Sequence, residues 1–97
     1  MATISSDVLA SYAADVAREV DGVHGLVEGT TLHRHKGVRV IEEGGGVRIE
    51  LHIAVEWGAP IPAVGHQLQA RVAAYLAQMA SVEADAVDVV VDRIVPV

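Results

Sequence analysis

The chain contains no cysteine and no phenylalanine, and only 3% of its 97 residues are aromatic. Without thiols it cannot form a disulfide bond, a cysteine-ligated metal site or a cysteine nucleophile. The scarcity of aromatic residues means that a core must be built from Val, Ala, Ile and Leu. Hydrophobic residues nevertheless make up 52% of the chain, which excludes an intrinsically disordered protein. The length predicts a single domain over residues 1–97.

Positive charge is also scarce. The chain has 7 Lys and Arg residues and 13 Asp and Glu residues, so its net charge is −6 when His is neutral. Such a balance repels nucleic acids and anionic lipid surfaces, so we expect no nucleic-acid partner. The N-terminal residues lack the basic and apolar regions of a signal peptide. The most apolar stretch, Val87–Val97, is interrupted by charges and is too short to span a bilayer. We therefore expect no direct membrane insertion.

Apolar residues spaced three and four apart predict two helices. The first stripe covers Leu9–Val20 and follows Ser5 and Ser6, either of which can accept a hydrogen bond from a free N–H of the first turn. The second stripe covers Ile61–Met79, with Pro62 at a position that a helix start tolerates. Each helix therefore has one apolar side to bury.

Strict alternation of apolar and polar residues over Val47–Trp57, with Trp57 on the apolar side, predicts a half-buried strand. Val38–Glu42 is its expected hairpin partner across a glycine-rich turn, and Ala86–Val95 is a third strand. The segment Val23–Gly37 is irregular, and we expect a short extended piece followed by a loop. The order α-β-β-α-β predicts a two-layer α+β fold: a small mixed sheet of three main strands with two helices on one face.

The last expected strand carries aliphatic residues on both faces. Alternation places Val89 and Val91 on one face and Val90 and Ile94 on the other. Two helices can cover only one of these aliphatic faces. The second face therefore predicts a contact with another copy or a partner through Val90 and Ile94. The alternative is that the loop Gly25–Gly37 folds over this strand. Both interpretations remain open from the sequence.

His33 and His35 are the best metal-ligand candidates, because residues two apart on a strand point to the same side. His24 or His52 would have to supply a third ligand. Cations flank the pair and no carboxylate lies close to it in the sequence. A solvated basic loop is therefore the simpler interpretation of this segment.

The sequence gives little support for RNA binding or for catalysis. Arg34, Lys36 and Arg39 form the main basic cluster, but an RNA-binding module needs a basic groove or stacking aromatics, and aromatics are scarce here. Glu50 and His52 share the polar face of a strand, where we expect solvent exposure and no cleft that would tune an acid–base pair. We predict no catalytic residue and no cofactor.

Two motifs resemble those of a known family. Glu19-Val20, Gly22-Val23 and Gly25-Leu26 form an EV-x-GV-x-GL motif after the first helix. A second motif, V-E-aromatic-G-x-x-IP-x-V, consists of Val55, Glu56, Trp57, Gly58, Ile61, Pro62 and Val64. With the helix and closing strand that follow, they are similar to the alkaline shock protein 23 (YloU-like) envelope stress response family, over nearly the whole chain.

This resemblance implies a cytoplasmic, non-enzymatic protein of cell-envelope homeostasis or stress response that self-assembles and reaches the membrane through anchoring partners. It offers no catalytic residue to carry over. We therefore predict a self-associating scaffold or adaptor, a homo-oligomer that docks onto a membrane-anchored or cell-envelope partner. The alternatives are a small histidine-dependent metal-binding module and an RNA-binding α+β domain.

Overall fold

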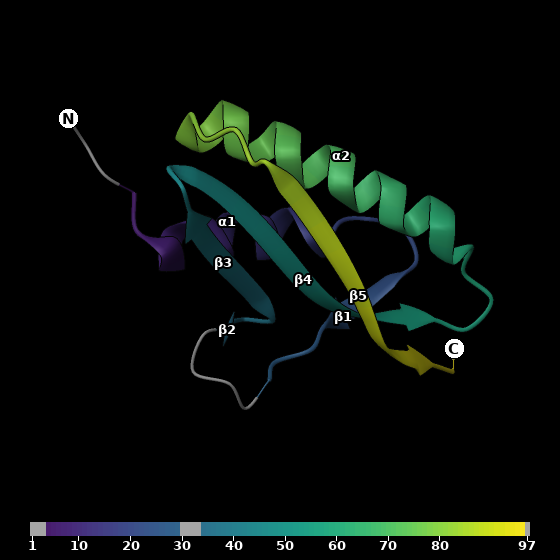
Figure 1. The fold of residues 1–97 in the computed structure, drawn as a ribbon. Coiled ribbons are helices and arrows are strands. Elements are labelled where there is room, and N and C mark those ends of the chain that lie inside the picture. The colour runs from purple at the N-terminus through teal and green to yellow at the C-terminus, as the bar shows by residue number, and fades with distance from the viewer. Residues whose placement is uncertain (1–3, 30–33, 97) are drawn as a thin grey trace.

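The computed structural model describes residues 4–29 and 34–96, which form two helices and a five-stranded mixed sheet (Figure 1). The elements in chain order are α1 (Ser6–Ala17), β1 (Val23–Leu26), β2 (Arg34–His35), β3 (Val38–Glu43), β4 (Gly46–Glu56), α2 (Ile61–Ala80) and β5 (Ala86–Val95). The predicted α+β class and the order of the main elements are confirmed. The short strands β1 and β2 occupy the segment that was predicted to be an extended piece and a loop.

The strand β4 is the centre of the sheet. Both β3 and β1 pair antiparallel with β4, while β5 pairs with it in parallel along its length. The backbone N–H of His52 donates to the carbonyl of Gly37 (2.9 Å), and the carbonyl of His52 accepts from the N–H of Val27 (2.8 Å). Because both groups of one strand residue point to the same edge, β1 and β3 share one edge of β4. That arrangement leaves the other edge to β5.

Both helices contribute to one core on one face of the sheet. Figure 1 shows α2 running along β5 and α1 behind β3 and β4. Alternate residues of β4 face the helices, as the sequence predicted, and α1 contributes mainly small side chains. The fully buried residues include Ile49, Leu51, Ile53 and Val55 of β4, Leu68, Val72 and Leu76 of α2, and Ala13, Ala14 and Ala17 of α1.

The predicted start of each helix is confirmed. Of the two candidate caps of α1, Ser5 is the N-cap, and its hydroxyl accepts from the N–H of Val8 (3.2 Å). In α2, Pro62 lies in the first turn, where a missing N–H costs no helical hydrogen bond.

The position of Trp57 differs from the prediction. Alternation placed its side chain on the buried side of the strand, but β4 ends at Glu56 and the Trp57 side chain is 71% exposed. The Trp57 N–H still donates to the carbonyl of Val95 (2.8 Å). The chain then turns at Gly58, where φ is +88°, a value that favours glycine.

A β-bulge near Asp92 changes which face the end of β5 presents. Val90 pairs with His52, whose side chain lies on the face away from the helices. Beyond the bulge, Ile94 pairs with Val55, which belongs to the helix-facing core. The prediction that Val90 and Ile94 share one face is therefore wrong, because the extra residue inverts the alternation of the strand.

The segment between α1 and β3 does not cover β5 in the part that the structure describes. Its strand β1 pairs with β4 and its strand β2 pairs with β3, on the edge of β4 away from β5. Among the residues described, no helix is long and apolar enough to cross a membrane.

Candidate interaction surface

A groove lined by aliphatic side chains and by the polar residues His66 and Gln69 separates the start of α2 from β5. Its volume is about 240 Å³, and its lining includes Val89 and Val91, which are only partly buried although they face the helix layer. The remaining lining residues are Ile53, Val55, Ile61, Pro62, Gly65, His66 and Gln69. Periodicity in the sequence assigned the aliphatic members to the core. The periodicity predicts which side of its element each residue faces. It does not predict that α2 leaves Val89 and Val91 of β5 uncovered.

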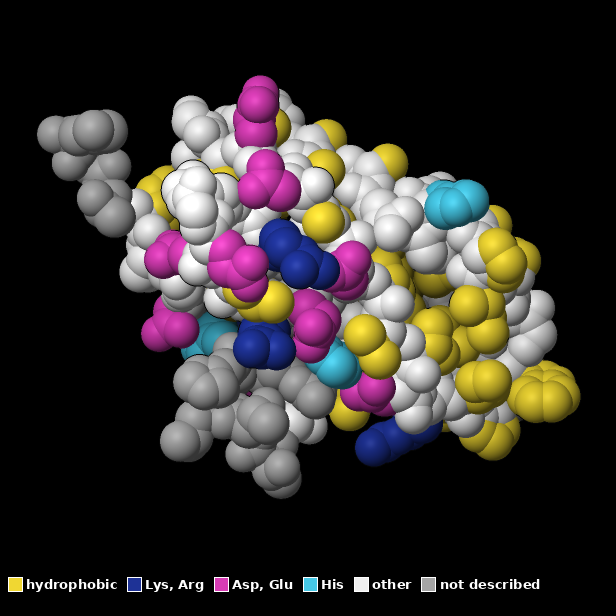
Figure 2. Space-filling view, in the orientation of Figure 1, with side chains coloured by type: hydrophobic (Ala, Val, Ile, Leu, Met, Phe, Trp, Pro, Cys, Tyr) yellow, Lys and Arg dark blue, Asp and Glu magenta, His cyan; other side chains and the backbone are white. Residues whose placement is uncertain are grey.

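Exposed apolar side chains continue from the groove to the end of the molecule where α2 begins and β4 and β5 end. Figure 2 shows hydrophobic side chains gathered on this side. Besides Trp57, Ile94 is 47% exposed here and Ile61 is also exposed. A second cavity of about 530 Å³ lies against Trp57 and Pro60. We call Trp57, Ile61, Ile94 and the two groove valines the apolar end.

The face of the sheet away from the helices is charged and contains a buried histidine. The His52 side chain lies between Glu50 and Asp92, with Nε2 2.6 Å from Glu50 Oε1 and Nδ1 3.0 Å from Asp92 Oδ2. The residue is 7% exposed, so the expectation of an exposed side chain is wrong. Both ring nitrogens face carboxylates, which leaves neither for a metal ion or a nucleophile. The ring instead links β4 to β5.

A second ion pair lies on the same face. Arg48 donates to Asp88 at 2.7 Å, and this hydrogen bond and the carboxylate charge raise the pKa of the Arg48 guanidinium. Val90 lies on β5 between Asp88 and Asp92 and is 37% exposed. The predicted interaction residue Val90 is thus an aliphatic side chain within a charged surface, whereas Ile94 belongs to the apolar end.

The histidines do not converge in the described part of the chain. His33 lies outside the described residues, so its pairing with His35 stays a prediction. His35 is in β2, while His24 is exposed on β1, and both nitrogens of His52 contact carboxylates. Over residues 4–29 and 34–96, no group of three or more potential ligands is placed to hold a metal ion.

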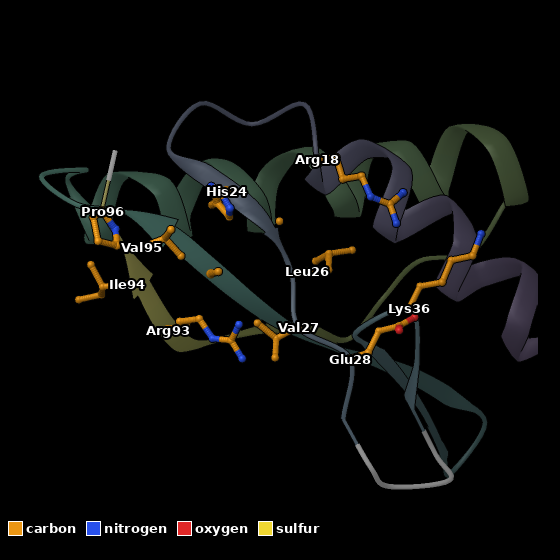
Figure 3. Close-up of a pocket in the computed structure, with 12 residues that line it drawn as sticks. Arg18, His24, Leu26, Val27, Glu28, Lys36, Arg93, Ile94, Val95 and Pro96 are labelled. Atoms are coloured by element: carbon orange, nitrogen blue, oxygen red, sulfur yellow. The ribbon is translucent and has the colours of Figure 1, made fainter.

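A further cavity, of about 680 Å³, lies beside β1 and the end of β5 and has three cations in its lining. These are Arg18, Lys36 and Arg93, which lie at the C-cap of α1, in the turn after β2, and in β5. In Figure 3 the charged end of Arg93 lies apart from those of Arg18 and Lys36. The arrangement does not concentrate positive charge at one point, as a built anion site would.

The basic cluster predicted for RNA gathers at one hairpin. Arg34 and Arg39 are cross-strand neighbours in β2 and β3, and Lys36 lies in the turn between them. The tyrosines do not accompany them, since Tyr12 and Tyr75 pack edge to face against each other on the helices, with ring centroids 5.9 Å apart. These tyrosines therefore offer no stacking surface beside the cations.

Comparison with known proteins identifies one family. The sequence model of the alkaline shock protein 23 family matches residues 1–96 of this chain, and that family is described as having a cell envelope-related function. Comparison with curated proteins gave no match.

Several solved structures share the fold. A copper form of the MamM CTD has a TM-score of 0.62 at 15% identity, over 91% of this chain and 85% of that chain. A manganese form of a MamM CTD variant has a TM-score of 0.57 at 16% identity, over 92% and 99%. A cadmium form of another variant has a TM-score of 0.57 at 16% identity, over 90% and 94%. Similarity at these identities shows the fold alone, and the metals belong to those proteins.

Proposed function

The chain belongs to the alkaline shock protein 23 family, which has a cell envelope-related function, and from this premise we propose that it is a non-enzymatic scaffold. In this proposal the protein associates with itself and docks onto a membrane-anchored or cell-envelope protein. It works in the cytoplasm and reaches the membrane only through that partner. The proposal adds to the family's general role a mode of action, namely protein–protein contact.

The observation that carries the proposal is the aliphatic surface left around β5. The groove valines, Ile94 and the nearby Trp57 form a contiguous apolar region at one end of a small domain, and Val90 adds an exposed aliphatic side chain on the opposite face. Contiguous exposed apolar regions of this kind mark interaction sites in soluble proteins. On the opposite face, the polar side chains of His52 and Arg48 are used in contacts with carboxylates.

Self-association is tested by sedimentation of the full chain over a range of concentrations. We expect a concentration-dependent oligomer, and we expect Val90→Lys and Ile94→Lys each to raise its dissociation constant by about tenfold or more. Met79→Lys is the matched control, because Met79 is 50% exposed but lies at the other end of α2. A wild-type chain that stays monomeric at several hundred micromolar, or lysine variants that assemble normally, would contradict the proposal.

Docking is tested by co-sedimentation with membranes from the native host. We expect binding to these membranes, loss of binding after protease treatment of the membrane surface, and no binding to vesicles made from the extracted lipids. Binding to the bare vesicles would contradict a protein partner, since the net charge of −6 opposes contact with anionic lipid.

The two alternatives have no specific support from the geometry. The metal-binding module depends on His33, which lies outside the described residues, and elemental analysis of untagged protein tests it. The RNA-binding module depends on the cations of the β2–β3 hairpin, and a salt-dependent gel shift tests it.

A further inference from the structure

The edge of β5 away from β4 directs the backbone groups of alternate residues outward. The carbonyl of Val87 accepts from Nε2 of Gln69 (3.0 Å) rather than from β4, so this residue points away from the sheet. Alternate strand residues direct both backbone groups to the same side, so Val89 and Val91 also point away from β4. Beyond the bulge the carbonyl of Val95 accepts from the N–H of Trp57, the residue after β4, which leaves the backbone groups of Ile94 pointing outward. Among the described strands, β5 pairs only with β4.

The sequence of this edge reads the same in both directions from Val90. Val89 and Val91 flank the centre, and Asp88 and Asp92 follow on either side. With one bulge residue skipped, the next positions are also aliphatic, Val87 on one side and Ile94 on the other. A contact between two identical surfaces related by a two-fold axis brings residue i opposite residue j and residue j opposite residue i, so this pattern places aliphatic residues opposite aliphatic residues.

We infer that two copies of the chain pair antiparallel through their β5 edges, with the two-fold axis at Val90. The inference deepens the proposed self-association and rests on it. In this register, Val89 lies opposite Val91 of the partner subunit, and both residues direct their N–H and carbonyl groups to the shared edge. These residues form hydrogen-bonded pairs, whereas the two Val90 residues face each other as a non-hydrogen-bonded pair, with Cα atoms about 4.5 Å apart.

The same register places apolar side chains of the partner subunit beside the groove. Val89 and Val91 of each copy face the helix layer, so the partner's side chains extend the strip of valines into the space beside α2. Val87 meets Ile94 of the partner subunit, which covers one of the most exposed aliphatic residues of the apolar end. The pairing therefore removes part of the apolar end from water.

Charge limits the strength of this contact. On the opposite face of the sheet, Asp88 of one copy lies near Asp92 of the other, and like charges placed across strands repel. Each carboxylate already has a partner, since Asp88 accepts from Arg48 and Asp92 contacts His52. Arg93, beside the bulge, adds a positive charge to the same region. The register is thus compatible with a reversible dimer.

Single cysteine substitutions test this register, because the chain has no cysteine of its own. Val90→Cys places the thiols of the two copies opposite each other at the axis. The separation of the two Cα atoms lies within the range that a disulfide tolerates. We expect this variant to form a covalent dimer as the major species under mild oxidation. Val8→Cys is the control, because Val8 is 41% exposed but lies on α1, away from β5, and we expect little covalent dimer.

A mixture of two variants provides a second readout. Val89→Cys mixed with Val91→Cys should give mainly the mixed disulfide, because the register places residue 89 of one copy opposite residue 91 of the other. This readout also applies if Val90→Cys does not fold, which circular dichroism would show.

The outcomes separate this inference from the proposed function. A wild-type dimer in sedimentation, together with the Val90→Cys and mixed cross-links, supports the β5 pairing. A wild-type dimer whose cysteine variants do not cross-link above the Val8→Cys level overturns the β5 pairing while self-association stands. A wild-type chain that remains monomeric at several hundred micromolar overturns both.

Discussion

His52 shows how one polar side chain can join two strands on the outer face of the sheet. Its ring is held between a carboxylate from its own strand, Glu50, and one from β5, Asp92. These carboxylate side chains are only 24% and 30% exposed, so solvent does not fully replace a lost partner. The contact therefore contributes more to stability than an ion pair in open solvent does.

Replacing His52 tests how much this contact contributes to the stability of the fold. We expect His52→Leu to lower the free energy of unfolding by about 1–3 kcal/mol, because the two carboxylates lose their hydrogen-bond donor in a half-buried site. Urea denaturation followed by circular dichroism measures the change. His24→Leu is the control, since His24 is exposed on β1 and a surface substitution changes stability by about 0.5 kcal/mol or less. Equal effects of the two substitutions would contradict a linking role for His52.

Of the three residues in this contact, Glu50, His52 and Asp92, the sequence predicted that the first two share a face. Glu50 and His52 are two residues apart on an alternating strand, so their shared face follows from local pattern alone. Asp92 lies 40 residues further along the chain, and its place beside His52 depends on the parallel register of β4 and β5. No local pattern encodes that register, which is set by how α2 packs on the sheet. The burial of His52 was missed for this reason.

At the scale of elements, the end of α2 carries local strain. Ser81 follows the last helical residue with φ at +55°, and the N–H of Val82 donates to the carbonyl of Leu76 (3.2 Å). A residue with a side chain adopts this left-handed conformation at a cost, whereas glycine adopts it readily.

We therefore expect Ser81→Gly to raise the free energy of unfolding by about 0.5–1 kcal/mol. Ala80→Gly, one residue earlier and still helical, should lower it by about 1 kcal/mol or more, because glycine is unfavourable inside a helix and the Ala80 methyl group is buried. Thermal or urea denaturation of both variants measures these opposite signs. A loss of stability in Ser81→Gly would contradict the left-handed conformation at that position.

The main elements were predictable because each carries a long periodic signal. The structure confirms the buried side of α2 at Val64, Leu68, Val72 and Leu76 and that of β4 from Ile49 to Val55. Ile61 and Met79, at the two ends of the predicted stripe of α2, are exposed. The strands β1 and β2 have four and two residues, too few to show a period, and they are strands only because they pair with β4 and β3. The bulge near Asp92 also leaves no local signal, so the predicted common face of Val90 and Ile94 was wrong.

For the molecule as a whole, small size and uncovered apolar surface act together. A domain of this length buries only about 60–65% of the surface that its unfolded chain exposes, so its stability as a single copy is modest. The sequence predicted that one aliphatic face exceeds what two helices cover. The structure places the excess at the apolar end, of which the groove valines and Ile94 are the part that pairing of two chains through β5 would bury.

Pairing then couples assembly to stability, because association that requires the folded state shifts the unfolding equilibrium by mass action. For a dimer that dissociates as it unfolds, a tenfold rise in protein concentration adds about 0.7 kcal/mol per chain, which raises the unfolding midpoint by about 3–5 °C in a domain of this size. Scanning calorimetry over a hundredfold range of concentration measures the shift. We expect Val90→Lys to unfold at a midpoint that does not depend on concentration, while Met79→Lys follows the wild type. A wild-type midpoint that is equally independent of concentration would show that the folded single chain, and not a dimer, is the species that unfolds.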